Sequence, residues 1–368
     1  MTEALDEIQI LDFSRVLAGP FATMMLADFG ASVTKVERAG VGDDTRAWGP
    51  PFGADGQATY FKSVNRNKTS VWLDLTQPGD LERARQLAAE ADVVVENFRP
   101  GVMAKLGLGY DDLRSANPGL VYCSITGFGD GEAGAQLPGY DLLIQALGGL
   151  MSITGEPGGE PLKAGVALVD VLAGLFATVG ILTALEHRRR SGEGQQVDVD
   201  LLSALLASLV NQASAYTVAG VVPGRMGNRH PSIAPYELLA TGDGDLVLAV
   251  GTDRQFGELC AVLGLPELAT DPRFASNAAR VENRDQLRPE LERTLLSRPA
   301  AEWAARLSER RVPAGVVNDI AAAFEFATAL GLEPTVEIAT EVGDPVTLPR
   351  NPIRLSKTPA SYRLPPPS

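Results

Sequence analysis

The stretch IQILDFSRVLAGPFATMMLADFGASVTKVER, residues 8–38, decides the fold class of this chain. Its first six residues form a short apolar run, which is typical of a buried strand. Pro20 suits the first turn of a helix, and Gly30 suits the end of one. Residues 32–38 follow as a second strand. The stretch therefore predicts a strand, a helix and a strand in succession.

The same order of strands and helices continues along the chain. Apolar runs at residues 69–75, 92–97 and 120–126 predict further strands, and residues 81–91 predict a helix. Strands that alternate with helices imply an α/β fold with a mainly parallel sheet covered on both faces. Such a sheet binds ligands in the crevice outside the carboxyl ends of its strands. The loops expected there are residues 15–20, 38–46, 97–105 and 127–141.

The composition disfavours several classes of function. The 368 residues carry a formal net charge of −14, which would repel nucleic acid and anionic membranes. The N-terminal segment lacks the basic region and apolar core of a signal peptide, so we expect a cytoplasmic protein. The two histidines and two cysteines do not have zinc-site spacings, so we expect no metal. Cys123 lies in an apolar strand and is expected in the core.

Positive charge gathers in the loops of the expected ligand crevice. The basic residues are Arg15, Arg38, Arg46, Arg99 and Lys105, with Arg66 and Lys68 nearby in sequence. In an acidic protein this asymmetry suits a phosphate-bearing ligand. The alternative is that each is a solvated side chain that balances nearby carboxylates. Neither the G-x-G-x-x-G fingerprint nor the G-x-x-x-x-G-K-[ST] loop occurs, which disfavours a dinucleotide oxidoreductase.

A second stretch, residues 163–194, places one acidic residue at the head of an apolar run. Residues 171–185 are almost all apolar, so the helix predicted there is expected to be buried on every side. Asp170 lies in its first turn, where the helix dipole favours the ionised carboxylate. Two interpretations stay open, a helix cap and a catalytic carboxylate. Residues 164–185 are long enough to cross a bilayer, but Asp170 inside the span disfavours a membrane helix.

The second half of the chain predicts a smaller domain. After a strand-like segment at 195–202 we expect one long helix at 201–220 and a loop rich in Gly and Pro at 222–235. A hairpin edge is expected at 242–250, with helices near 253–263, 283–297 and 300–310 and an extended C-terminal segment from 345. We therefore predict a large domain from residues 1–205 and 325–368, a linker at 206–235 and a small domain at 236–324.

An ordered set of motifs is similar to that of one known family. The motifs are ILDFSRVLAGP at 10–20, KVER at 35–38 followed by GDDTR, NRNKTSVWLDL at 65–75, VVVENFRPG at 93–101, SITGFG at 124–129, PGYDLLIQALGGLMSITG at 138–155 and VALVD at 166–170. Together they resemble the class III coenzyme A transferases, the CaiB/BaiF family. The resemblance implies a Rossmann-like large domain built from both chain ends, a smaller α+β domain between them, and an interlocked homodimer.

The resemblance also implies the residues of the site. The aspartate that precedes the family's long helix is its nucleophile, so Asp170 takes the role of attacking a thioester carbonyl. The positions that resemble coenzyme A contacts, with Arg15 of the basic loops beside them, are Val16, Ala18, Arg38, Asn97, Phe98, Arg99 and Lys105. Arginine and lysine would hold the phosphates, and Phe98 would line the adenine pocket.

Tyr140 and Asp141 help to divide the family. The α-methylacyl-CoA racemases carry His-Asp at this point, since moving an α-proton needs a second acid or base. Tyrosine, with an ordinary pKa near 10, is a poor base at neutral pH, so transferase is favoured over racemase. The other interpretation of these two residues is a turn followed by a helix cap.

The resemblance predicts a CoA transferase that moves coenzyme A from an acyl-CoA to a carboxylic acid through covalent aspartyl intermediates. Formyl-CoA transferase carries glutamine where this chain has Leu17, and the pattern around residues 140–165 looks closer to members that use succinyl-CoA or other short donors. A racemase and a CoA-binding protein without turnover are the alternatives. The expected partners are acyl-CoA, a carboxylic acid and a second copy of the chain.

Overall fold

The computed structural model describes residues 3–340 and 343–368, which divide into two compact units. One unit contains the chain up to Leu150 with Lys163–Val221 and Glu333–Ser368. The other contains Met151–Leu162 and Val222–Leu332. These boundaries differ from the predicted ones at 205, 235 and 324. Gly and Pro density locates a loop, but it does not show with which unit the neighbouring residues pack.

The large unit is built on a six-stranded sheet in the order β3-β2-β1-β4-β5-β6, and every neighbouring pair is parallel. This order is that of the doubly wound dinucleotide-binding fold, with its switch point between β1 and β4. The predicted α/β class is thereby confirmed. The strands are β1 (Gln9–Asp12), β2 (Ser32–Arg38), β3 (Lys68–Leu73), β4 (Val93–Glu96), β5 (Val121–Thr126) and β6 (Gln196–Asp200).

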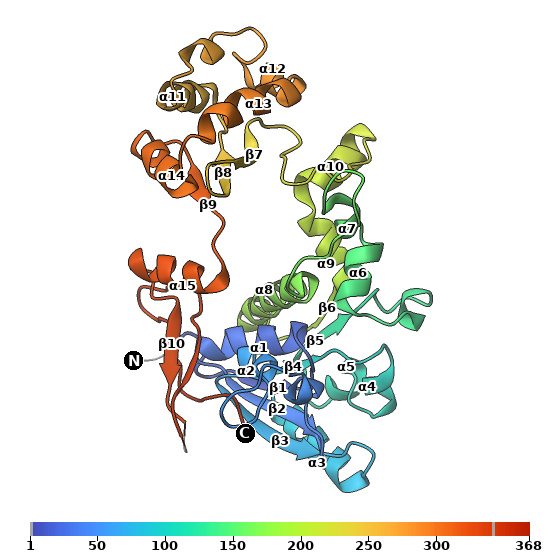
Figure 1. The fold of residues 1–368 in the computed structure, drawn as a ribbon. Coiled ribbons are helices and arrows are strands. Elements are labelled where there is room, and N and C mark those ends of the chain that lie inside the picture. The colour runs from blue at the N-terminus through green and yellow to red at the C-terminus, as the bar shows by residue number, and fades with distance from the viewer. Residues whose placement is uncertain (1–2, 341–342) are drawn as a thin grey trace. The chain divides into compact units, whose positions relative to one another are not determined.

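Helices cover both faces of this sheet (Figure 1). Because side chains alternate along a strand, Ile10 faces one layer and Leu11 the other. The first layer consists of α1 (Ala18–Asp28) and α8 (Leu168–Ser191), which pack on the face that also holds the buried Cys123. The second consists of α3 (Pro78–Glu90), α4 (Val102–Lys105) and α5 (Tyr110–Leu113).

The helix α8 begins three residues before the predicted apolar run and places Asp170 in its first turn, as expected. Its small residues Ala173 and Ala177 are buried against the core. The prediction that the helix is buried on every side is wrong for the single chain, because Phe176 and Val179 are 43% and 62% exposed. Hydrophobic content alone does not distinguish a face covered by the same chain from one left open.

The predicted helix at 201–220 is two helices, α9 (Leu201–Ser208) and α10 (Val210–Ala219), which meet at 83°. Val210 adopts a left-handed φ of 42° at the junction, which interrupts the helical path. Helix breaks are usually marked by glycine or proline. This one lies at a β-branched residue, which rarely takes this conformation, so the sequence did not reveal it.

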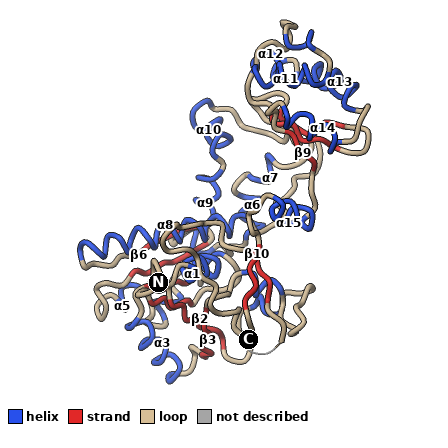
Figure 2. Tube along the Cα trace, turned by 90° about the vertical axis from the view of Figure 1, so that its left-hand side faces the viewer, coloured by secondary structure: helices blue, strands red, loops and turns tan. Residues whose placement is uncertain are grey.

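The C-terminal segment belongs to the large unit, as predicted for residues 325–368. The hairpin of β10 (Thr335–Ile338) and β11 (Val346–Pro349), visible in red in Figure 2, precedes it. The Asn67 N–H then donates to the Leu364 carbonyl at 2.9 Å. Beneath this segment Asp28 at the end of α1 is buried in an ion pair with Arg66 at 2.6 Å. The basic residue Arg66 therefore supports the fold and does not face a ligand crevice.

The small unit has its own sheet and core. Its strands β7 (Tyr236–Ala240), β8 (Asp245–Ala249) and β9 (Ala314–Val316) form an antiparallel sheet in that order. The core contains Phe256, Phe274 and Trp303. The remaining helices of this unit are α11 (Asp253–Leu263), α12 (Asn277–Glu282), α13 (Arg284–Leu295), α14 (Ala300–Glu309) and α15 (Ile320–Ala329), with the 3-10 turn η3 (Pro266–Ala269).

Short elements complete the chain. They are η1 (Asp44–Ala47), α2 (Thr59–Ser63), η2 (Gly134–Gln136), α6 (Asp141–Leu147) and α7 (Leu150–Ile153). The first four lie in the loops that follow β2 and β5, at or near the carboxyl ends of the strands, where the topology places a ligand crevice.

Candidate active site

Two cavities lie at the carboxyl edge of the large sheet. The first, of about 320 Å³, is lined by the turn after β1, the loop after β4, the segment after β5 and the head of α8. The second, of about 410 Å³, is lined by the ends of β1, β2 and β3 and by α4. Arg15 and Phe98 line both, with the Arg15 guanidinium 4.6 Å from the Phe98 ring centroid. The two cavities therefore adjoin.

The structure brings all the sequence-predicted site residues to these two cavities. Those around the first are Arg15, Val16, Ala18, Asn97, Phe98, Arg99, Tyr140, Asp141 and Asp170. Those around the second are Arg15, Arg38, Phe98 and Lys105. Their roles toward a ligand stay predictions, but their common location is a property of the fold.

Asp170 is the third residue of α8, and its half-buried side chain lines the first cavity. Within residues 3–340 and 343–368 its carboxylate accepts no hydrogen bond. Burial raises the pKa of Asp170 to about 7, and the negative charge of Asp141 contributes to the rise. Desolvation disfavours the charged form and so opposes the helix start, which favours it.

The cap of α8 is Asp141, which is 29 residues away from Asp170 in sequence. Its Oδ1 accepts from the Val169 N–H at 2.8 Å and from the Asp170 N–H at 3.3 Å. Its Oδ2 accepts from the Gln145 Nε2 amide at 2.6 Å. A carboxylate at this place satisfies backbone N–H groups that have no partner within the helix. Because Asp141 is the cap, the carboxylate of Asp170 does not serve as one.

The segment after β5 approaches this site through two glycines. A Cβ on Gly127 would lie 2.5 Å from the Gly139 Cα, and a Cβ on Gly139 would lie 2.6 Å from the Gly127 Cα. Only glycine fits such a close backbone approach. The contact brings Tyr140, whose side chain is 67% exposed, to the edge of the first cavity.

The model of one protein family, described as CoA-transferase family III, matches residues 5–368. The chain belongs to CoA-transferase family III. A succinate–glutarate CoA-transferase of Agrobacterium fabrum is 45% identical, with 99% of this chain and 92% of the relative covered. A succinyl-CoA:glutarate CoA-transferase of Mus musculus is 41% identical, with 99% and 83% covered. A crystal structure of a CAIB/BAIF family protein from Brucella suis is 42% identical, covers 100% of this chain and 97% of its own, and has a TM-score of 0.89.

As a CoA-transferase, the chain uses an acyl-CoA as substrate. The contacts of each basic residue indicate whether it is available to bind the phosphates of that substrate. Arg38 and Arg15 both approach Asp44, at 3.6 Å and 4.0 Å, and stay partly exposed at the cavities. Two other predicted basic residues are occupied elsewhere. Arg46 is held by Glu37 at 2.7 Å, and Lys68 is buried 3.1 Å from Asp12. The phosphate-binding prediction therefore narrows to Arg15, Arg38, Arg99 and Lys105.

Asn97 also lines the first cavity, and its ligand contact stays a prediction, while its side chain holds the neighbouring backbone. Its Oδ1 accepts from the Arg15 N–H at 2.8 Å, and its Nδ2 donates to the Arg15 carbonyl at 2.7 Å. Both halves of the amide hold the backbone of the turn after β1. The side chain thus shapes the cavity wall.

The sequence interpretation did not single out several residues around the first cavity. Burial raises the pKa of Tyr60 on α2, and the charges of Asp170 and Asp141 raise it further. No motif marked this residue. It also missed Lys35 and Asp43, a fully buried ion pair at 2.9 Å beneath the turn. The signal for that pair is a lysine in the middle of a buried strand.

No metal centre is indicated in the part of the chain that the structure describes, where no group of three His, Cys, Asp or Glu side chains is arranged to hold an ion.

Proposed function

We propose that this CoA-transferase moves coenzyme A between succinyl-CoA and another short dicarboxylic acid, with Asp170 as the nucleophile. The observation that carries the proposal is the Asp170 carboxylate, which lines the cavity beside the basic turn and is not used as a helix cap. Two relatives at 45% and 41% identity are named as succinate or succinyl-CoA and glutarate transferases, which supports the substrate class. Leu17 also lines the cavity, as an apolar wall.

The proposed reaction has two exchanges. The ionised Asp170 carboxylate attacks the thioester carbonyl of the donor, the C–S bond breaks, and coenzyme A leaves as a thiolate, which gives a mixed anhydride. The thiolate then attacks the Asp170 carbonyl, which releases the donor acid and leaves a thioester between Asp170 and coenzyme A. The acceptor carboxylate repeats these two steps in reverse order, so no water or proton is consumed.

The proposed ligand arrangement follows the charge of the two cavities. The larger cavity takes the adenosine phosphate end of coenzyme A, because Arg38 and Lys105 line it beside the apolar Leu73 and Phe98. The smaller cavity takes the thioester, because it holds Asp170. A protein of net charge −14 needs such local basic residues to hold an anionic substrate.

The direct test incubates the purified protein with succinyl-CoA and a panel of dicarboxylic acids that includes glutarate and oxalate. We expect glutaryl-CoA to form, as measured by liquid chromatography and mass spectrometry, and none to form when the acid is omitted. Coenzyme A binding without acyl exchange for any acid would favour a binding protein without turnover. Deuterium uptake at the α-carbon of a 2-methylacyl-CoA in heavy water would favour the racemase.

We also propose that a second copy of this chain covers the exposed side of α8. Leu175, Phe176, Val179 and Leu182 leave an apolar face that monomeric proteins rarely expose to water. By length and composition α8 is able to cross a membrane, but its other face is committed to the sheet core through Ala173 and Ala177. The proposal is therefore a homodimer in which the partner covers this face of α8.

Light scattering on the protein eluting from a gel-filtration column tests the dimer. We expect twice the mass of one chain, and Val179→Glu is expected to lower the mass or prevent folding, since it places a charge in the covered face. Gln86→Glu adds the same charge at an exposed position of α3, on the other face of the sheet, and is expected to leave the mass unchanged. A wild-type protein that stays monomeric at micromolar concentration and needs no detergent would contradict the proposal.

A further inference from the structure

We propose that Asp43 is a positioning residue for coenzyme A. Together with Lys35 it fixes the backbone turn Ser14–Ala18, which forms a wall of the smaller cavity. The inference rests on the proposed function in one respect, that the ligand at this wall is coenzyme A.

The turn between β1 and α1 is a strained piece of backbone at the cavity. Val16 has a left-handed φ of 69°, and it lines the cavity together with Leu17 and Ala18. A β-branched residue rarely adopts that conformation, which persists only where its surroundings hold it. The turn therefore depends on partners outside itself.

Side chains from four other places hold successive peptide groups of this turn. The Ser14 N–H donates to the Asp12 Oδ1 at 2.9 Å, and the Ser14 carbonyl accepts from the Lys35 Nζ at 2.8 Å. The N–H and carbonyl of Arg15 are both bound by Asn97. The Val16 N–H points at the Asp43 carboxylate, 3.3 Å and 3.4 Å from its two oxygens. Five consecutive polar groups are thus fixed from outside the turn.

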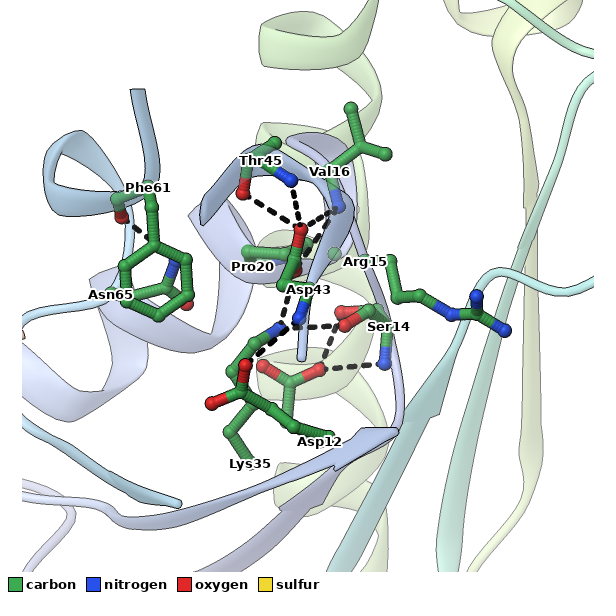
Figure 3. Close-up of polar contacts among 12 residues, drawn as sticks. Asp12, Ser14, Arg15, Val16, Pro20, Lys35, Asp43, Thr45, Phe61 and Asn65 are labelled. Carbon is green, nitrogen blue, oxygen red and sulfur yellow. Dashed lines mark hydrogen bonds and ion pairs between the residues drawn. The ribbon is translucent and has the colours of Figure 1, made fainter. Parts of the chain in front are cut away.

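Asp43 is the centre of this support, as Figure 3 shows with contacts that converge on its carboxylate from Val16, Thr45 and Lys35. Thr45 donates both its N–H and its hydroxyl to Asp43, at 2.9 Å and 2.7 Å. The Lys35 ammonium lies 2.9 Å from the other oxygen, and both side chains are fully buried. Burial alone would raise the pKa of Asp43, but the charge of Lys35 and these hydrogen bonds hold the pKa below its ordinary value.

The layer beneath contains a second pair of opposite charge. The Lys68 Nζ lies 3.1 Å from the Asp12 Oδ2 and also donates to the Pro20 carbonyl at 2.9 Å. The carboxylates of Asp12 and Asp43 therefore balance the two lysines in a buried group of four charges. Loss of the Asp43 charge leaves one positive charge without compensation directly under Val16, which is costly in a buried site.

If Asp43 only stabilised the fold, its loss would affect stability and not ligand binding. Another buried aspartate serves as a control that distinguishes these two roles. Asp28 lies at the opposite end of α1, is fully buried, and pairs with Arg66 at 2.6 Å. It lines neither cavity. Asp28→Asn and Asp43→Asn remove the same charge from the same unit, but only the second loosens the cavity wall.

The experiment measures coenzyme A binding by isothermal titration calorimetry, with thermal unfolding of each protein recorded beside it. We expect Asp43→Asn to weaken the Kd for coenzyme A about tenfold or more, because one lost buried partner costs at least about 1.4 kcal/mol at the wall. We expect Asp28→Asn and Asp43→Asn to lower the unfolding temperature by similar amounts. Asp28→Asn is expected to leave the Kd within about twofold of wild type, since Asp28 and the turn are at opposite ends of α1.

The outcomes distinguish the two proposals. Equal Kd values for Asp43→Asn and Asp28→Asn would overturn the positioning role while the proposed function stands. A wild-type protein that does not bind coenzyme A would overturn both. If Asp43→Asn does not fold, Thr45→Val removes one hydrogen bond to the Asp43 carboxylate and is expected to weaken binding about threefold, and an unchanged Kd in that variant would also overturn the inference.

Discussion

Replacing Asp170 with asparagine is expected to abolish acyl exchange, with a fall in kcat of about 10³-fold or more. The amide has nearly the same shape as the carboxylate but does not form the anhydride with the donor acyl group. The measurement is the initial rate of glutaryl-CoA formation from succinyl-CoA. Mass spectrometry of the donor-treated wild type, after trapping with hydroxylamine, should place the hydroxamate on Asp170.

The control for this variant is Asp112→Asn. Asp112 lies in the first turn of α5 and lines neither cavity, so its amide variant is expected to keep wild-type activity. Full activity in Asp170→Asn would show that the nucleophile has been misassigned. A hydroxamate on another carboxylate would show the same.

The stability of Asp170→Asn provides an independent check on the environment of the carboxyl group. The pKa of Asp170 is raised to about 7 in the folded protein and is near its ordinary value of 3.8 when unfolded. The folded state therefore binds the proton more tightly, so the stability contributed by this group is present below pH 4 and is lost as pH rises through about 7. At pH 8 the asparagine variant is expected to unfold at a higher temperature than wild type.

The pH dependence of the reaction should report the Asp170 and Asp141 pair. Attack requires the ionised carboxylate, so kcat/KM for succinyl-CoA is expected to fall as pH drops below about 7. Asp141→Asn removes a negative charge that raises this pKa, while its side-chain oxygen can still accept from the Val169 N–H. We expect the acidic limb of its profile to move to lower pH. Burial, the larger cause, is unchanged, so the limb should stay above the ordinary aspartate range.

Asp141→Ala separates the charge of this residue from its structural role. It removes the same charge and also the cap at the start of α8, which contains Asp170. Misplacement of a nucleophile is costly, and we expect kcat to fall about tenfold or more relative to Asp141→Asn. Identical pH profiles for wild type and both variants would show that Asp141 does not act on Asp170.

Much of the large unit was predictable from the sequence. The strands are apolar runs of the expected length, and the rule that ligands bind at the carboxyl ends of parallel strands located the loops that line both cavities. Asp170 was predictable as a first-turn residue because the apolar run of α8 begins directly after it. The cap of α8 was not predictable. Asp141 contacts α8 only in the folded structure, and the sequence around Asp141 indicated only the start of α6.

The remaining features depend on contacts that periodicity does not encode. Lys68 and Arg66 looked like loop cations, but each is neutralised by an aspartate that is distant in sequence. The break at Val210 arises at a residue type that ordinarily avoids the left-handed region. The exposed face of α8 has the composition of a core, so the sequence alone suggested complete burial.

The C-terminal segment that lies along α1 has a consequence for the order in which the chain folds. The small unit's main part, Val222–Leu332, is continuous, whereas the large unit needs Leu364 to pair with Asn67, and Ser361 to donate to the Asp28 carbonyl. During synthesis Val222–Leu332 is therefore made before the last segment of the unit with both cavities. Closing a loop of about 300 residues costs entropy that grows only slowly with length, so this late docking is affordable. Until it occurs, the unit with both cavities lacks the contacts of its last segment, and incompletely folded chains are the ones that chaperones and proteases act on.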